Sequence, residues 1–180
     1  NELWSRLKEI SLGGATVKTL TSEDLLFVLC VHHAKDGWEW LERARDIAAL
    51  VGQSPDLQWE EIIQRARRFG GLRMLLLGLF LASDLFEMRL PSRVEQLIQE
   101  DSSLEILAQE IRRRSDRQAQ AGPSVWQRLR FHLKVRERFI DQVRFLVFLA
   151  LSPSGSDWES LPLPIWLCRR IRKIPELASF

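Results

Sequence analysis

The sequence predicts a mostly α-helical protein, a bundle of about seven helices with one short N-terminal β-hairpin. Three observations support this. Apolar residues recur every three or four positions along most of the chain, which is the period of a buried helix face. Glycine and proline stand between these stretches, where helices end. With 46% hydrophobic and 28% charged residues among 180, the composition is that of an ordinary globular protein.

Residues 1–20 are the exception to the helical period. Gly13-Gly14 separates two short apolar stretches within residues 8–20, and two adjacent glycines suit the positive φ angles of a type I′ turn. We therefore predict a β-hairpin. Because an isolated two-stranded hairpin is only marginally stable, it should pack on the helices or form the end of a catalytic sheet outside these 180 residues. Asn1 stands where an initiator Met would, so the second alternative predicts a fragment or a processed product.

Residues 21–121 are predicted to form the helical core. Thr21 or Ser22 can cap the first helix, which should end at Gly37 with one of His32 and His33 facing inward. Further helices are expected at residues 38–51, 59–69 and 72–86, from Pro91 onward, and at 104–115. The segment 72–86 is apolar nearly all round, which predicts a central buried helix.

The last part, residues 122–180, follows the interruption at Gly122-Pro123. Here we expect one long helix over 125–151, then a Pro-rich tail and a short terminal helix over 165–174, in the same domain or a subdomain. Several tryptophans lie near helix starts on apolar stripes, which favours core packing over base stacking: Trp38, Trp40, Trp59 and Trp126.

Several classes of protein are disfavoured by composition. No apolar run reaches the ~20 residues of a transmembrane helix, and no signal peptide opens the chain. The cysteines, Cys30 and Cys168, have no partner at zinc-site spacing, so Cys30 is expected in the core and the compartment is expected to be cytoplasmic. The sequence also lacks a P-loop, a dinucleotide fingerprint and a nucleophile elbow.

Charge is distributed unevenly along the chain. Residues 1–110 carry a balance of −6, whereas residues 111–144 carry +7, within a total of +2. This basic belt, with Arg112 and Arg113 as its candidate contacts, could hold phosphates of a nucleotide or of RNA. The simpler interpretation is that the belt docks on the acidic first half or covers a solvated helix face. The small total charge disfavours nucleic acid without settling the choice.

The densest group of chemically active residues lies on the first helix. Glu23 and Asp24 could bind a cation, but acids in a first helical turn are favoured by the helix dipole alone. Neighbouring residues also point about 100° apart, which argues against a shared metal. His32, Lys35 and Asp36 fall within about one turn and could form a ligand-facing patch, in which Lys35 suits a phosphate.

Three strings in the first half resemble a known pattern: Glu23-Asp24-Leu25-Leu26, Leu29-Cys30-Val31-His32-His33-Ala34-Lys35 and Asp46-Ile47-Ala48-Ala49-Leu50. They are similar to the C-terminal helical part of the uncharacterised nucleotidyltransferase family, which has a polymerase-β-like catalytic fold. The similarity is clearest over residues 1–90. It implies transfer of a nucleoside monophosphate from a nucleoside triphosphate with Mg²⁺, which the family holds on an Asp-x-Asp pair.

This chain contains no Asp-x-Asp pair. The resemblance therefore implies a missing N-terminal catalytic domain, and we expect the 180 residues alone to be inactive. His32, Lys35 and Asp46 match recurrent positions and are implied to contact the nucleotide, whereas His33 and Asp36 depart from the pattern. Two alternatives stay open, a non-enzymatic helical protein-interaction module and an RNA-binding basic helix.

Overall fold

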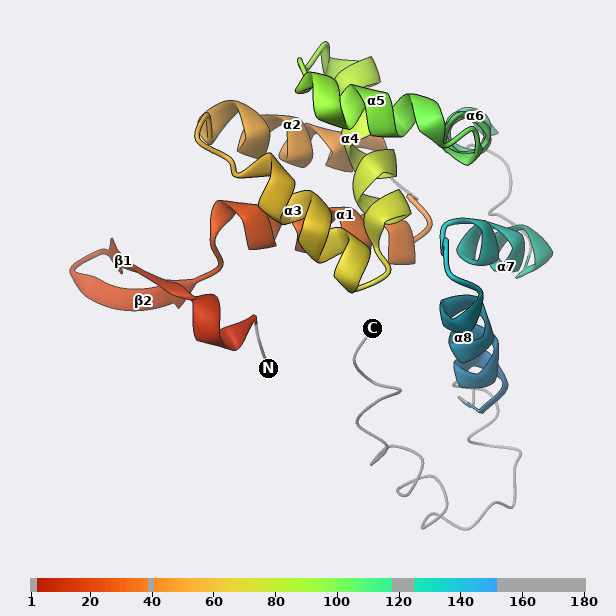
Figure 1. Ribbon diagram of the computed structural model, residues 1–180, viewed down its shortest axis with the longest axis horizontal. Coiled ribbons are helices and arrows are strands. Elements are labelled where there is room, and N and C mark those ends of the chain that lie inside the picture. Colours follow the sequence, from red (N-terminus) through yellow and green to blue (C-terminus); the bar gives the residue numbers. More distant parts are fainter. Residues whose placement is uncertain (1–2, 39–40, 118–124, 152–180) are drawn as a thin grey trace, which may run out of the picture. The chain divides into compact units, whose positions relative to one another are not determined.

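The computed structural model describes residues 3–38, 41–117 and 125–151 (Figure 1). The chain divides into two compact units, residues 1–137 and 138–180. The predicted fold class is confirmed, because the described residues form eight α-helices and one two-stranded antiparallel sheet. None of these helices combines the length and hydrophobicity needed to cross a lipid bilayer.

The N-terminal segment contains the predicted hairpin, drawn as the red arrows in Figure 1. A 3₁₀ turn, η1 (Trp4–Arg6), precedes β1 (Lys8–Leu12) and β2 (Ala15–Thr19), which pair with Ile10 opposite Val17. Gly13 and Gly14 have φ angles of 58° and 84°, the left-handed values that a type I′ turn requires. All of β1 is solvent-exposed, and β1 and β2 pair only with each other within the described part of the chain.

The first two helices of the core are α1 (Ser22–Lys35) and α2 (Ala44–Gln53). The Thr21 hydroxyl accepts the Asp24 N–H at 3.2 Å, which confirms the predicted cap. The expected helix start at Trp38 is wrong. Gly37 and Trp38 both have positive φ angles, 67° and 55°, so the chain cannot continue helically there, and α2 begins only after a 3₁₀ turn, η2 (Leu41–Arg43). Trp40 lies outside the described residues.

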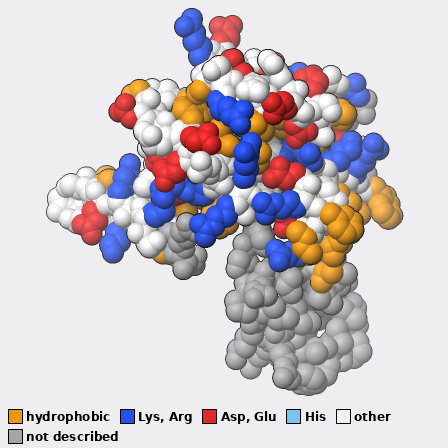
Figure 2. Space-filling view, in the orientation of Figure 1, with side chains coloured by type: hydrophobic (Ala, Val, Ile, Leu, Met, Phe, Trp, Pro, Cys, Tyr) orange, Lys and Arg blue, Asp and Glu red, His pale blue; other side chains and the backbone are white. Residues whose placement is uncertain are grey.

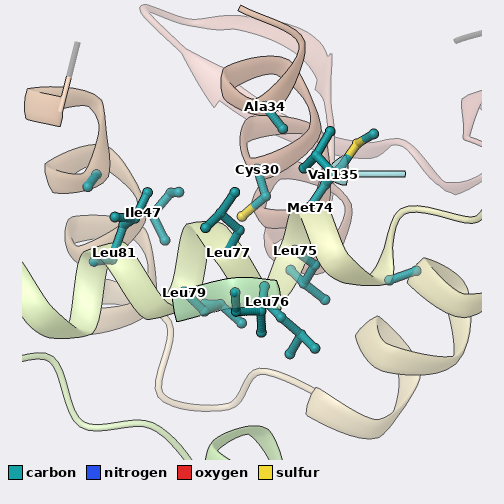
Figure 3. Packing of buried hydrophobic residues seen from close by; sticks show 14 of the residues in the cluster. Cys30, Ala34, Ile47, Met74, Leu75, Leu76, Leu77, Leu79, Leu81 and Val135 are labelled. Carbon is teal, nitrogen blue, oxygen red and sulfur yellow. The ribbon is translucent and has the colours of Figure 1, made fainter. Parts of the chain in front are cut away.

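The remaining core helices are α3 (Trp59–Arg68), α4 (Leu72–Phe86), α5 (Ser92–Glu100) and α6 (Ser103–Arg117). The prediction of a central buried helix over 72–86 is confirmed. Helix α4 packs against α1, α2, α3, α5 and α6, and its side chains fill the centre of the core (Figure 3). Its fully or nearly fully buried residues include Leu75, Leu76, Leu77, Leu79, Leu81 and Ala82.

The expected single helix over 125–151 is also wrong, because it is divided into α7 (Val125–Lys134) and α8 (Phe139–Leu151). The Lys134 carbonyl, at the end of α7, accepts a hydrogen bond from Arg73 at 2.8 Å. Shortly after, the Glu137 carboxylate accepts the first N–H of α4, that of Leu72, at 3.3 Å. These contacts satisfy backbone groups that helix ends otherwise leave unpaired, so contacts with α4 favour a break that the local sequence does not signal.

The tryptophans do not all behave as predicted. Trp38 is buried and Trp59 packs against the core, as expected. Trp126, in contrast, is 78% exposed, so the prediction that its indole packs in the core is wrong. The predicted Pro-rich tail and the terminal helix over 165–174 lie outside the described residues.

Candidate functional site

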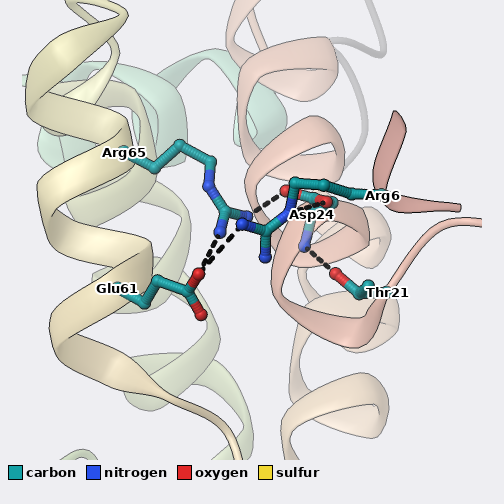
Figure 4. Close-up of polar contacts among 5 residues, drawn as sticks. All are labelled: Arg6, Thr21, Asp24, Glu61 and Arg65. Atoms are coloured by element: carbon teal, nitrogen blue, oxygen red, sulfur yellow. Dashed lines mark hydrogen bonds and ion pairs between the residues drawn. The ribbon is translucent and has the colours of Figure 1, made fainter. Parts of the chain in front are cut away.

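Asp24, a possible cation ligand from sequence, is instead part of a buried ion-pair network (Figure 4). Its side chain is 1% exposed and accepts hydrogen bonds from Arg65 on α3 and from Arg6 at 3.3 Å. Glu61 accepts from both arginines at 2.9 Å. Both Asp24 oxygens are therefore occupied by guanidinium groups, and the carboxylate joins η1, α1 and α3. Sequence reasoning missed this network because Arg6 and Arg65 lie 18 and 41 residues away.

The end of α1 orients its two histidines differently. His32 is 62% exposed at its side chain, and its Nε2 lies 3.5 Å from Asp36, which also accepts Arg43 Nη1 at 2.5 Å. His33 is the inward one, 4% exposed, with its ring centroid 5.3 Å from that of the buried Trp38. Burial lowers the pKa of His33, and the Arg43 charge lowers it further. His33 is therefore neutral at pH 7, and His32 is the histidine available to a ligand.

Lys35, the predicted phosphate contact, is partly buried at the last position of α1. Burial lowers the pKa of its ammonium, and the charge of Arg136 lowers it further. Lys35 makes no ion pair or hydrogen bond within the described residues. A partly buried cation beside a second cation is electrostatically unfavourable unless an anion is supplied.

Asp46 lies on α2, exposed to solvent. The charge of Asp46 raises the pKa of His33, against the lowering by burial. His32 and Lys35 thus lie together in the last turn of α1, whereas Asp46 lies in the first turn of α2, after a turn and a 3₁₀ segment.

Arg112 and Arg113 were the other residues predicted to contact a phosphate. The structure does not place them at the end of α1. Arg112 pairs with Asp84 of α4 at 2.7 Å and covers the Phe80 ring, while Arg113 points to solvent. The arginine of this run that lies near the end of α1 is Arg114. A Cβ added to Gly37 would lie 3.9 Å from its Nη1. Consecutive helix residues point about 100° apart, so Arg112 and Arg114, two positions apart on α6, lie on different sides of the helix and reach different neighbours.

Helix α7 and the short segment after it contribute further cations, Arg128 and Arg136. Arg114 lies over the buried Phe131 ring at 4.8 Å and pairs with Glu110 at 2.9 Å. Burial lowers the pKa of His132 to about 4, with the charges of Arg136, Arg114 and Arg128 acting in the same direction. The charges of these three arginines thus all act on His132. The sequence analysis placed the arginines in the basic belt without relating them to this histidine.

Other candidate chemistry is not supported within the described residues. They contain no group of three or more His, Cys, Asp or Glu side chains placed to hold a metal ion. Cys30 is fully buried between α1 and α4, and burial raises the pKa of its thiol, as expected of an unreactive core residue.

The fold and this region together define a helical protein with an exposed hairpin and a cation-rich end of α1. Residues 1–87 match the model of a family described as uncharacterised nucleotidyltransferase. The match confirms the resemblance to this family over the first half of the sequence, but it does not support the prediction that these residues are the C-terminal part of the family pattern. It covers just under half of the 180 residues. Comparisons with curated proteins and with solved structures found no significant match.

Proposed function

We propose that this chain supplies the helical, substrate-side part of a nucleotidyltransferase, which transfers a nucleoside monophosphate from a nucleoside triphosphate to an acceptor. The observation that carries the proposal is the family match over residues 1–87. In this proposal those residues correspond to the helical, C-terminal part of the family pattern. Because the chain has no Asp-x-Asp pair, the acids that bind Mg²⁺ are supplied from outside the 180 residues.

The residues described here do not fit a magnesium centre of their own. Asp24 is fully engaged by Arg6 and Arg65, and the described residues have no other suitable acid cluster. We therefore assign no metal-dependent step to this chain. Its contribution is to bind and orient the nucleotide, which lowers the entropic cost of bringing the triphosphate to the reacting groups.

Lys35 is the residue we assign to a phosphate of the nucleotide. Its ammonium is partly buried and has no ion-pair partner in the described residues, so a phosphate oxygen would supply the missing negative charge. His32 is exposed one turn earlier, within reach of the same ligand, and Asp46 offers a carboxylate for a sugar hydroxyl. This assignment keeps the three positions implied by the family resemblance.

The exposed hairpin suits the same proposal. Ile10 and Val17 are cross-strand partners on one face of a ribbon that no other described strand pairs with. A two-stranded sheet gains stability when it joins further strands. We propose that β1 and β2 adjoin the sheet that carries the metal-binding acids.

Isothermal titration of the 180-residue protein with ATP and Mg²⁺ tests the nucleotide assignment. We expect weak binding, reduced about tenfold or more in Lys35→Ala, because a charge-assisted contact is lost. Lys18→Ala is the matched control, since Lys18 is an exposed lysine on β2 and should bind as the unmodified protein does. Circular dichroism confirms that both variants are folded. Equal binding by Lys35→Ala and the unmodified protein would overturn the role of Lys35.

A further inference from the structure

Helix α8 exposes several large hydrophobic side chains to solvent. Among its 13 residues, the polar ones are Asp141, Gln142 and Arg144. On the face of the molecule drawn in Figure 2, by comparison, charged side chains of both signs are interspersed over most of the described surface. A helix that is apolar nearly all round is normally buried. The described residues therefore leave α8 without the surface that should cover it.

The hydrophobic residues of α8 include one continuous stripe along the helix. Phe139 and Leu146 are seven residues apart, as are Ile140 and Val147, and Val143 lies between the two pairs. Residues at this spacing share one face of an α-helix. We call these five residues the α8 stripe. The exposed fraction is 78% for Phe139, 53% for Ile140 and 41% for both Leu146 and Val147, so most of the stripe is open to water.

Asp141, which lies off the α8 stripe, is more sheltered than the stripe itself. Its side chain is 13% exposed, and its Oδ1 lies 3.7 Å from Nη1 of Arg144. A polar residue that is more buried than the apolar face of the same helix reverses the usual arrangement in water. An apolar segment laid along the α8 stripe would restore that arrangement.

The sequence that follows α8 offers such a segment. Residues 152–180 lie outside the described part of the chain, and the sequence predicts a helix within them, over 165–174. Leu167, Ile171 and Ile174 recur at the spacing of one helix face. The charged residues of this segment fall on the other side: Arg169, Arg170, Arg172 and Lys173. Because so short a helix is marginal by itself, its apolar face needs a partner.

The connection is long enough for this segment to return along α8. The 13 residues of α8 rise about 20 Å, whereas residues 152–164 can span about 40 Å when extended. Pro162 and Pro164 precede the predicted helix, and Pro175 follows it, so its ends are marked. Residues 138–180 also form one compact unit, which places α8 and the segment in the same part of the fold.

We propose that residues 165–174 pack as an amphipathic helix on the α8 stripe and form a helical hairpin with α8. Leu167, Ile171 and Ile174 face the stripe, and the four cations of the segment face solvent. The occupant of this surface is thus a segment of the chain itself. The proposal concerns residues 138–180 alone and does not depend on the nucleotide assignment.

Cys168 makes the arrangement testable in the full chain, because it follows Leu167 at the edge of the predicted apolar face. Cys30 does not compete, since it is fully buried and burial raises the pKa of its thiol. Ile140→Cys and Val147→Cys each place a thiol on the α8 stripe. Phe148→Cys is the matched control: Phe148 is 46% exposed, close to the 41% of Val147, but points about 100° away from it.

The measurement is disulfide formation under mild oxidation at low protein concentration, followed by mass spectrometry of the linked peptides. We expect Cys168 to form an intramolecular disulfide with at least one of the two stripe thiols about tenfold faster than with the control thiol, because a disulfide requires the two Cβ atoms to lie close together. Equal rates for the stripe and control variants would overturn the proposal. A covalent dimer through the stripe thiols would overturn it too, since a second copy would then be the occupant.

Binding of the dye ANS, which reports exposed hydrophobic surface, gives a second readout. We expect Ile171→Ser to increase ANS fluorescence because the α8 stripe becomes uncovered, whereas Arg172→Ser leaves it unchanged. Circular dichroism checks that both variants are folded. Equal ANS fluorescence in the unmodified protein and Ile171→Ser would contradict the proposed packing. Protection of the Val147→Cys thiol from a water-soluble maleimide only when phosphatidylcholine and phosphatidylserine vesicles are added would identify a lipid surface as the occupant instead.

Discussion

Asp24 shows how a single carboxylate can be structural where its position suggests chemistry. It lies in the first turn of α1, where an acid interacts favourably with the helix dipole, as the sequence predicted. Its burial and its two arginine partners add a second role, which is to fix η1 and α3 on α1. Removing one member of such a buried pair leaves the other charge without compensation.

Asp24→Asn tests this role. The substitution keeps the shape of the side chain but leaves Arg65, which is 9% exposed, beside a neutral amide. We expect a loss of about 3 kcal/mol in the free energy of unfolding, at the lower end for a broken buried pair because Glu61 still contacts Arg65. Urea denaturation measures this loss of stability, provided that the m value is the same for the variant and the unmodified protein. Glu105→Gln, an exposed change, is the control, and a similar small effect in both variants would contradict the structural role.

Only some residues of the candidate site could be predicted from the sequence. Helical spacing grouped His32, Lys35 and Asp36, and the structure keeps them on the last turn of α1 and at its cap. The same reasoning could not decide between Arg112 and Arg114, since both belong to one basic run. That choice depends on the rotation of α6 against α4 and α7, which is set by packing between helices.

At the scale of elements, α4 is the helix on which the others depend. Its Gly78 faces α1 and α2, and an added Cβ there would lie 2.7 Å from Cys30 Sγ and 3.1 Å from Ile47 Cδ1. A residue without a side chain thus permits close approach of three helices. The sequence identified the buried helix but gave no signal that Gly78 was a contact point.

Gly78→Ala should therefore destabilise the protein by about 1–3 kcal/mol, although alanine favours a helix over glycine by about 1 kcal/mol. Thermal and urea unfolding measure the change. The double variant Gly78→Ala with Cys30→Ala should recover part of the loss, because the contacting sulfur is removed. Gly52→Ala on α2 is the matched control: nothing lies within 4 Å of its added Cβ, so its stability should stay equal or rise. Equal effects at both glycines would contradict the packing argument.

The ends of helices and strands could be predicted where a residue at the end itself, such as a glycine, marks them. Gly37 and Gly70 take positive φ angles at the ends of α1 and α3, and Gly13-Gly14 closes the hairpin. The division of the predicted helix at 125–151 was not predictable, because its partners, Arg73 and Leu72, lie more than 60 residues earlier.

At the scale of the whole molecule, two partly or fully buried histidines make stability depend on pH. Burial lowers the pKa of both His33 and His132, so the folded protein binds fewer protons than the unfolded chain below about pH 6.5. Stability is therefore fully present above that pH and is lost as the pH falls. For His132 the loss extends down to its folded pKa of about 4.

We expect the free energy of unfolding to decrease between pH 6.5 and pH 4, with His132 contributing on the order of 2 kcal/mol. Urea denaturation at pH 7, 5.5 and 4 measures the decrease. In His132→Gln, which cannot titrate, the decrease should be smaller, and the remainder should include His33. A variant whose pH profile matches that of the unmodified protein would show that folding does not lower the pKa of His132.

The sequence by itself determined the fold class, the hairpin and the central position of α4, because periodicity and turn glycines act over a few residues. It also determined the resemblance over the first half, which the family match supports. Only the tertiary structure decided that Asp24 binds arginines, that His33 turns inward, and that Arg114 rather than Arg112 lies near Gly37 at the end of α1. These outcomes depend on charges and surfaces far apart in the chain, and such groups become neighbours only when the helices pack.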